Sequence, residues 1–294
     1  MPADQLTPVA PEVTDGPGPG SDWRQVNIEF SDWSAAPQIV ARRLRPVLDQ
    51  RSEGWWYIRK HPHWRLRHRA RQPLRPPSSS TPGRPDSALC ATLDALVADG
   101  VARAWHPVIY EPETLAFGGP TGMDVAHDLF CRDSPTTLAL LADPPEPGRD
   151  AGRTELSLLA VSRMLRAAGL DWYEQGEVWA RVAAARPATT TTRPAAQRAG
   201  AAVHRLVTLD TGPGTALLTD GPLTDHLAWL DAHHDAGAQL GALARTGQLT
   251  RGLRAVLAHH VIFHWNRLAL PSHDQHTLAA LARDALLPHG VITA

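Results

Sequence analysis

The first third of the chain alternates apolar and polar residues in the pattern of half-buried strands. The segments with this pattern are residues 23–33, 55–69 and 101–110. The second segment is kinked or broken into a hairpin at His61-Pro62, because proline cannot donate to a sheet ladder. Helices are predicted between the strands, over residues 36–49 and 87–99, and the latter ends at Gly100.

From Pro120 onward the spacing of apolar residues is mostly helical. The predicted helices cover residues 123–130, 136–141, 153–168, 223–245, 248–268 and 274–287. Strands early and helices late predict an α+β fold, with antiparallel strands in the N-terminal part and a mostly helical C-terminal half. We expect a single compact domain over residues 22–290 that follows a disordered tail at 1–21. Residues 72–86 and 186–199 are expected to be surface loops of low complexity.

Composition excludes several classes of protein. A chain of 294 residues with 43% hydrophobic content can bury a large core. The formal net charge of -1 gives no global basic field, so direct nucleic-acid binding is not expected. No apolar run approaches the roughly 18 residues that a membrane span needs. Two cysteines and no signal peptide predict a cytoplasmic protein without a disulfide framework.

Three arginines follow one face of the second strand segment. Side chains alternate with period two, so one face carries Trp64, Leu66 and His68 and the other carries Arg65, Arg67 and Arg69. Adjacent guanidiniums repel one another and resist burial. They therefore face either water, as an edge strand whose charges discourage aggregation, or a groove that receives an anion. Because Lys60 is the only lysine of the chain, arginine abundance itself says little, and only this placement counts.

The helix predicted over residues 248–268 continues its core-facing stripe into polar residues. At about 100° per residue the stripe consists of Leu253, Leu257, His260, His264, Arg267 and Leu268. A single histidine on such a stripe is usually a core residue whose ring has a hydrogen-bond partner. Two histidines and an arginine on the same face are better explained by a polar cavity at that end of the core. This second feature favours the anion groove.

Metal and nucleotide chemistry find little support in the motifs. His260 and His264 have the i, i+4 spacing of a helical zinc pair, but Val261 stands where the metalloprotease motif needs glutamate. No cysteine or carboxylate cluster lies nearby in the sequence to complete a metal shell. Phosphate-cradling glycine loops and the G-x-S-x-G elbow are also missing from the sequence. We therefore expect neither a metal nor an organic cofactor.

A third feature is the segment at residues 110–120, YEPETLAFGGP, which follows the last predicted strand. Its Gly-Gly-Pro end is a turn into the next helix. Glu111 and Glu113 lie just after the strand, where a carboxylate can pair with an arginine or transfer a proton. The alternative is two exposed loop glutamates, which the other two features make less attractive.

Together these segments resemble one family. They are WWYIRKHPHWRLRHR, YEPETLAFGGPTGMDVAHDLFCRDS and HHVIFHWNRLAL, and the resemblance covers about residues 23–290. They are similar to the C-terminal, elimination-type domain of lantibiotic dehydratases, and more closely to its free-standing form, the thiopeptide-type bacteriocin biosynthesis proteins. The resemblance implies two partners, a precursor peptide and a separate glutamyl-tRNA-dependent glutamylating dehydratase. That dehydratase glutamylates a Ser or Thr, and the small domain expels the glutamate to leave dehydroalanine or dehydrobutyrine. Whether the chain forms a homodimer is left open by the resemblance.

The resemblance also implies roles for individual residues. Arg65 and Arg67 match the arginines of the elimination site, where a forked guanidinium binds the glutamyl carboxylate bidentately. Glu113 matches the glutamate of the family's tyrosine–glutamate segment. His264 is the expected proton-exchanging histidine, and His260 is the second choice and a substrate contact. Arg67, Glu113 and His264 are thus the expected catalytic residues.

One departure from the family pattern keeps other functions open. The family often carries arginine three residues after the glutamate, where this chain has Ala116. Either Arg69 or Arg267 then holds the substrate, or the chemistry differs. One alternative is a formal [4+2] aza-cycloaddition of two dehydroalanines, which creates the pyridine of a thiopeptide. The other is a non-catalytic scaffold that binds the precursor peptide.

Overall fold

The computed structural model describes residues 22–71, 86–143, 152–187, 193–212 and 214–287. Four antiparallel strands form one sheet in the order β2-β3-β1-β4. They are β1 Trp23–Phe30, β2 Ser52–Lys60, β3 His63–Ala70 and β4 Ala102–Val108. β2 and β3 form a hairpin that turns at a cis His61-Pro62 bond, so of the two sequence alternatives the hairpin is confirmed.

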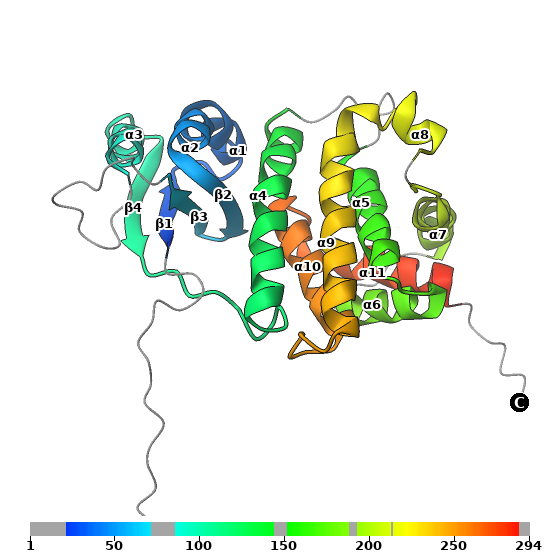
Figure 1. Ribbon diagram of the computed structural model, residues 1–294. Coiled ribbons are helices and arrows are strands. Elements are labelled where there is room, and N and C mark those ends of the chain that lie inside the picture. Colours follow the sequence, from blue (N-terminus) through cyan, green and yellow to red (C-terminus); the bar gives the residue numbers. More distant parts are fainter. Residues whose placement is uncertain (1–21, 72–85, 144–151, 188–192, 213, 288–294) are drawn as a thin grey trace, which may run out of the picture.

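Short helices cover one face of the sheet (Figure 1). They are α1 Ala36–Ile39, the π-helical turn η1 Val40–Leu44, α2 Arg45–Arg51 and α3 Ser87–Ala98. Val26 and Ile28 of β1 and Leu66 of β3 point into this layer and are buried. The alternation of apolar and polar residues in the sequence therefore correctly predicts which side chains face this core.

The helix α4, Pro120–Ala142, lies between the sheet and the other helices (Figure 1). It begins with proline in its first turn, a position where the missing N–H has no intrahelical partner to lose. The sequence predicts two shorter helices here, over residues 123–130 and 136–141. In the structure one continuous helix runs through the segment between them, with Pro135 inside the helix and with Asp133 and Ser134 fully buried.

The remaining helices form a bundle on the far side of α4 from the sheet (Figure 1). They are α5 Arg153–Ala167, α6 Trp172–Ala184, α7 Arg193–Thr208, α8 Ala216–Thr219, the 3-10 turn η2 Thr224–His226, α9 Leu227–Arg245, α10 Leu253–Arg267 and α11 Ser272–Leu286. The predicted α+β fold with a mostly helical C-terminal half is confirmed. None of the described helices is long and apolar enough to cross a bilayer.

The sequence predicts irregular structure at the N-terminus and in two loops. The loop expected over residues 186–199 is wrong in its second half, because α7 begins at Arg193. Pro194 is the second residue of this helix, and the first turn of a helix tolerates proline. The expected tail at 1–21 and most of the expected loop at 72–86 lie outside the described residues.

An aromatic layer fills the space between the second face of the sheet and the helices α4 and α10. Its largest members are Trp23, Trp56, Phe117, Phe130 and Phe263. The ring centroids of Trp56 and Phe130 lie 4.7 Å apart, and those of Phe130 and Phe263 lie 5.4 Å apart. This layer fixes the sheet against the bundle, and the candidate functional residues lie along it.

Candidate active site

The three arginines of β3 lie on the face of the sheet that meets the aromatic layer. Their cross-strand neighbours on β1 show this face: Asn27 is opposite Arg65, Gln25 opposite Arg67 and Trp23 opposite Arg69. β3 is an internal strand between β2 and β1, so the alternative of a solvated edge strand is wrong. The three side chains also differ, because Arg69 is exposed and pairs with Glu53 at 3.2 Å, whereas Arg67 is only 7% exposed.

Arg67 is a buried guanidinium held between two aromatic rings. Its Cζ atom lies 4.2 Å from the ring centroid of Trp56 and 5.0 Å from that of Tyr110. Nε donates a hydrogen bond to Oε1 of Gln25 at 2.7 Å, and the buried Nη1 has no hydrogen-bond partner among the described residues. Burial lowers the pKa of Arg67 to about 10, so the group remains charged at neutral pH. A charged donor of this kind suits an anion.

Glu113 lies within electrostatic range of Arg67 and pairs with His259, a histidine of α10 that was not among the predicted site residues. The Nε2 atom of His259 is 2.9 Å from Oε2 of Glu113. This hydrogen bond lowers the pKa of Glu113 below its ordinary value; partial burial opposes the shift, and the charges of His259, Arg67 and Lys60 support it. Glu113 is therefore ionised at neutral pH, with an imidazole bonded to its carboxylate.

A second titratable pair lies beside Arg67. The hydroxyl of Tyr110 and Nε2 of His127, on α4, are 2.9 Å apart. Burial raises the pKa of Tyr110, and Arg67 opposes this shift. Burial and, to a smaller extent, the charges of Arg67 and Arg69 lower the pKa of His127 to about 4. Both groups are thus neutral at neutral pH.

His264 lies in the helical core, in contact with side chains that belong to α4 and α9. Its Nδ1 is 3.1 Å from Oδ2 of Asp133, and the same oxygen accepts a hydrogen bond from Nε of Arg267 at 2.7 Å. Oδ1 of Asp133 accepts a hydrogen bond from Nε1 of Trp229 at 2.7 Å. Burial alone would raise the pKa of Asp133, but the charges of His264 and Arg267 hold it well below its ordinary value.

The polar stripe of α10 therefore points into the core as predicted, but the structure divides its members. His264 and Arg267 surround the buried aspartate from α4 rather than line a cavity. His260 is packed against Phe117 and Phe130, and neither of its ring nitrogens has a hydrogen-bond partner among the described residues. Burial lowers the pKa of His260 to about 3, so this ring is neutral. The structure does not bring His264 or Arg267 into contact with Arg67.

Asp133, His233 and His264 offer ligand atoms that all lie within 4.8 Å of one another, which is close enough for a metal ion. The charge balance argues against one. Arg267 already pairs with this carboxylate, with Nη2 2.7 Å from Oδ2, so a divalent cation would sit beside a buried guanidinium. We interpret the cluster as a structural ion network of the helical core.

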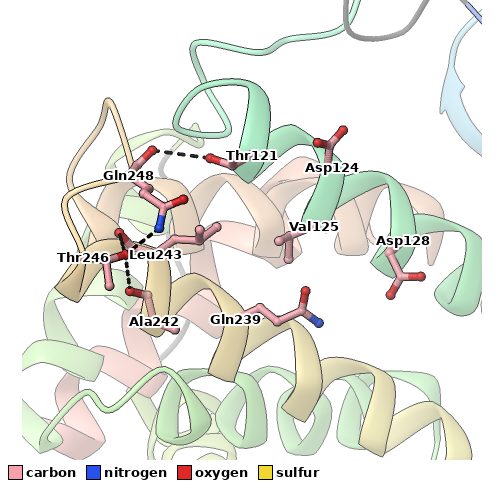
Figure 2. Close-up of a pocket in the computed structure, with 9 residues that line it drawn as sticks. All are labelled: Thr121, Asp124, Val125, Asp128, Gln239, Ala242, Leu243, Thr246 and Gln248. Carbon is pink, nitrogen blue, oxygen red and sulfur yellow. Dashed lines mark hydrogen bonds between the residues drawn. The ribbon is translucent and has the colours of Figure 1, made fainter.

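The structure also contains a cavity of about 500 Å³ between α4 and α9 (Figure 2). Thr121, Asp124, Val125 and Asp128 of α4 line one side, and Gln239, Ala242, Leu243, Thr246 and Gln248 line the other. On the side opposite α4, Nε2 of Gln248 donates to Oγ1 of Thr246 at 2.9 Å, and the Thr121 hydroxyl of α4 donates to the backbone carbonyl of Gln248 at 3.4 Å. The described residues that line it include no arginine and no histidine, in contrast to the arginine face.

Sequence reasoning missed four residues of this face: Gln25, Tyr110, His127 and His259. Tyr110 and His127 stand within the YEPETLAFGGPTGMDVAH segment that carries Glu113, and His259 precedes His260. Their presence in these segments was visible, but nothing in the sequence pairs them. The paired residues lie far apart in the sequence. Tyr110 and His127 are 17 positions apart, and Glu113 and His259 are 146 positions apart.

Comparisons with known proteins show the family and the fold of this chain. Residues 23–286 match the family described as "Lantibiotic biosynthesis dehydratase C-term". The fold is similar to that of the tRNA-dependent lantibiotic dehydratase MibB from Microbispora sp. 107891, with a TM-score of 0.64 and 18% identity; the match covers 96% of this chain but only 28% of MibB. A comparison with curated protein sequences finds no match.

Two smaller solved proteins share the fold over nearly their whole length. They are TsrL and TbtD, the latter described as a pyridine synthase from thiomuracin biosynthesis. Each has a TM-score of 0.53 and 15% identity with this chain and matches 90% of it, and the match covers 93% of TsrL and 97% of TbtD. At these identities the similarity shows the fold alone.

Proposed function

The chain belongs to the family of lantibiotic biosynthesis dehydratase C-terminal domains, and from this premise we propose that it eliminates glutamate from an O-glutamylated Ser or Thr of a ribosomal precursor peptide. The product of this lyase reaction is dehydroalanine or dehydrobutyrine. In this proposal a separate glutamyl-tRNA-dependent partner attaches the glutamate beforehand. The reaction needs an acid–base pair and an anion site, and no step requires a metal or an organic cofactor.

The single observation that carries the proposal is the buried guanidinium of Arg67, whose Nη1 has no hydrogen-bond partner among the described residues. A planar fork binds a carboxylate through two parallel hydrogen bonds, and such bonds are stronger where water is excluded. Arg65 lies two residues away on the same face, and its buried Nε is also without a partner in the described part of the chain. We assign the glutamyl carboxylate to these two arginines.

We assign the proton transfer to Glu113 and His259. The hydrogen bond from His259 and the charge of Arg67 keep the Glu113 carboxylate ionised. Glu113 can therefore accept the α-proton of the glutamylated residue. The electron pair of the Cα–H bond then forms the Cα=Cβ bond. The Cβ–O bond breaks, and its electron pair leaves with the carboxylate of glutamate. His264, packed against Asp133 in the core, receives a structural role in this proposal.

The test is to incubate a chelator-treated protein with an O-glutamylated peptide and follow the peptide by mass spectrometry. We expect glutamate release and a dehydro residue at the modified position. For substitutions of Arg67, the matched control is Arg24→Lys. Arg24 is an arginine of β1 that lies opposite His68, on the other face of the sheet. A glutamylated peptide that binds but stays unchanged would contradict the proposal.

A second candidate is the [4+2] aza-cycloaddition of two dehydroalanines. The observation that favours it is the match with TbtD, a pyridine synthase, over 97% of that protein. A peptide that carries a leader and two dehydroalanines discriminates the two reactions, because only cycloaddition ends with loss of water and leader. The non-catalytic scaffold predicts binding of both peptides with no change of mass in either.

A further inference from the structure

One pair of polar groups at the arginine face takes no part in the mechanism above. The Tyr110 hydroxyl lies 2.9 Å from Nε2 of His127. Tyr110 comes from the segment after β4 and His127 from α4, so two elements converge to form the pair. The His127 ring is 4.8 Å from that of Trp23, and the Tyr110 ring is 5.9 Å from that of Trp56. The aromatic layer therefore holds both rings in place.

The pair lies next to the groups that hold the substrate in the proposed function. The Tyr110 ring lies 5.0 Å from the guanidinium carbon of Arg67, which places the phenol on the rim of the proposed anion site. No carboxylate of the described residues forms an ion pair with His127, and its charged neighbours are Arg67 and Arg69. A histidine in this setting stays neutral, so it can orient a hydroxyl without competing for the substrate carboxylate.

We propose that Tyr110 is a further catalytic residue of the elimination, which donates a hydrogen bond from its hydroxyl to the carbonyl oxygen of the reacting Ser or Thr residue. His127 is the positioning residue: in this proposal its Nε2–H donates to the phenol oxygen, which leaves the single hydroxyl proton of Tyr110 for the substrate carbonyl. This inference rests on the proposed glutamate elimination and deepens it, because it names the group that stabilises the charge formed when the α-proton leaves.

The chemistry of the step explains why a neutral donor is needed there. When Glu113 takes the α-proton, the electron pair of the Cα–H bond moves onto the neighbouring carbonyl oxygen and forms an enolate. The pair then returns to make Cα=Cβ as the Cβ–O bond breaks towards glutamate. The phenol keeps its proton throughout, because burial raises the pKa of Tyr110 above its ordinary value. A preorganised donor at a developing oxyanion lowers the barrier most where water is excluded.

The ring contacts of Tyr110 do not account for its hydroxyl. Phenylalanine would keep the edge contacts with Trp23 and Trp56 and the stacking over Arg67, since these involve the ring alone. Only the hydroxyl reaches His127. Tyr110→Phe therefore separates the two roles within one side chain.

The first test compares wild type, Tyr110→Phe and the control Tyr173→Phe in steady-state elimination of a glutamylated peptide. Tyr173 is exposed on α6. We expect Tyr110→Phe to lower kcat by about 100-fold or more with KM unchanged, the effect of removing one oxyanion donor. Tyr173→Phe should match wild type. A Tyr110→Phe variant with full kcat, or with a raised KM and normal kcat, overturns the inference while the proposed function stands.

A second test does not depend on the folding of Tyr110→Phe. Site-specific replacement of Tyr110 by a polyfluorinated tyrosine lowers the phenol pKa by several units from its raised value, so kcat should fall in mildly alkaline solution where the wild type keeps its activity. The same replacement at Tyr173 is the control and should leave the pH dependence of kcat unchanged. If the variant at position 110 keeps the wild-type kcat in that solution, the inference is overturned. If wild type binds the glutamylated peptide but releases no glutamate, the proposed function and this inference both fail.

Discussion

At the scale of single residues, we expect the planar shape of the Arg67 side chain to matter more than its charge. We expect Arg67→Lys to lose elimination activity nearly as completely as Arg67→Ala. An ammonium keeps the positive charge, but it cannot stack between Trp56 and Tyr110 or present two parallel donors. Steady-state kinetics of both variants, with Arg24→Lys as the control, measures this. Near wild-type turnover of Arg67→Lys would show that simple charge attraction is sufficient.

His259 and His264 both belong to α10, but their substitutions should have opposite effects on activity and stability. His259 is partly exposed and contacts Glu113, so His259→Ala should lower kcat by about 10²–10⁴-fold and change stability by less than about 1 kcal/mol. His264 is buried against Asp133, so His264→Ala should lower the free energy of unfolding by about 1–3 kcal/mol.

Urea unfolding and initial rates, measured together, separate these effects. His234→Ala, a change on the partly exposed side of α9, is the matched control for both. If His264→Ala kept its stability and lost elimination, the proton transfer would return to His264, as the sequence alone suggested.

At the scale of elements, the turn before α4 positions Glu113 through a close backbone contact. A Cβ atom on Gly122 would lie 2.0 Å from the carbonyl oxygen of Phe117, so this glycine lets the helix start pack directly against the turn. Helix propensity alone predicts that Gly122→Ala adds about 1 kcal/mol of stability. We expect the steric clash to win, with a loss of about 1–3 kcal/mol and a raised KM as the turn shifts.

Gly200→Ala in α7 is the control for this prediction. There the nearest heavy atom to a new Cβ would be Cδ2 of Leu281 at 3.7 Å, an ordinary contact. This variant should be as stable as wild type or more so by up to about 1 kcal/mol, with unchanged kinetics. Thermal melts of the two variants side by side measure the difference. A stabilised Gly122→Ala with normal activity would show that the turn yields easily.

At the scale of the whole molecule, buried neutral histidines should make the fold sensitive to acid. Burial lowers the pKa of His68, His127 and His233 to about 4 and that of His260 to about 3. In the unfolded chain these histidines have a pKa of about 6.5. Between these values the unfolded state binds more protons, so the free energy of unfolding should fall as the pH decreases from about 6.5 towards 4.

His260→Leu isolates one of these contributions. Both ring nitrogens of His260 lack partners among the described residues, so leucine should leave stability at neutral pH unchanged or higher. Below about pH 6.5 the variant should lose stability less steeply than wild type, by up to about 1.4 kcal/mol per pH unit. Urea unfolding at several pH values measures the slope, with His106→Leu on the exposed side of β4 as control. Parallel slopes would contradict the assignment.

The sequence by itself determined the local features of this protein. Period-two alternation placed Arg65, Arg67 and Arg69 on one side of β3 and Leu66 on the other. The α+β order of elements followed in the same way. These features depend on the positions of neighbouring residues, which backbone geometry fixes through the periods of strand and helix.

The tertiary structure decided which of these residues meet. The sequence shows that His259, His260 and His264 belong to one predicted helix, but it does not say what packs against each. The crossing of α4 between the sheet and the bundle brought Asp133 to His264, while the turn before α4 brought Glu113 to His259. Contacts between residues more than 100 positions apart depend on how whole elements pack. Packing arises from the complementary shapes of many side chains at once, which no local pattern contains.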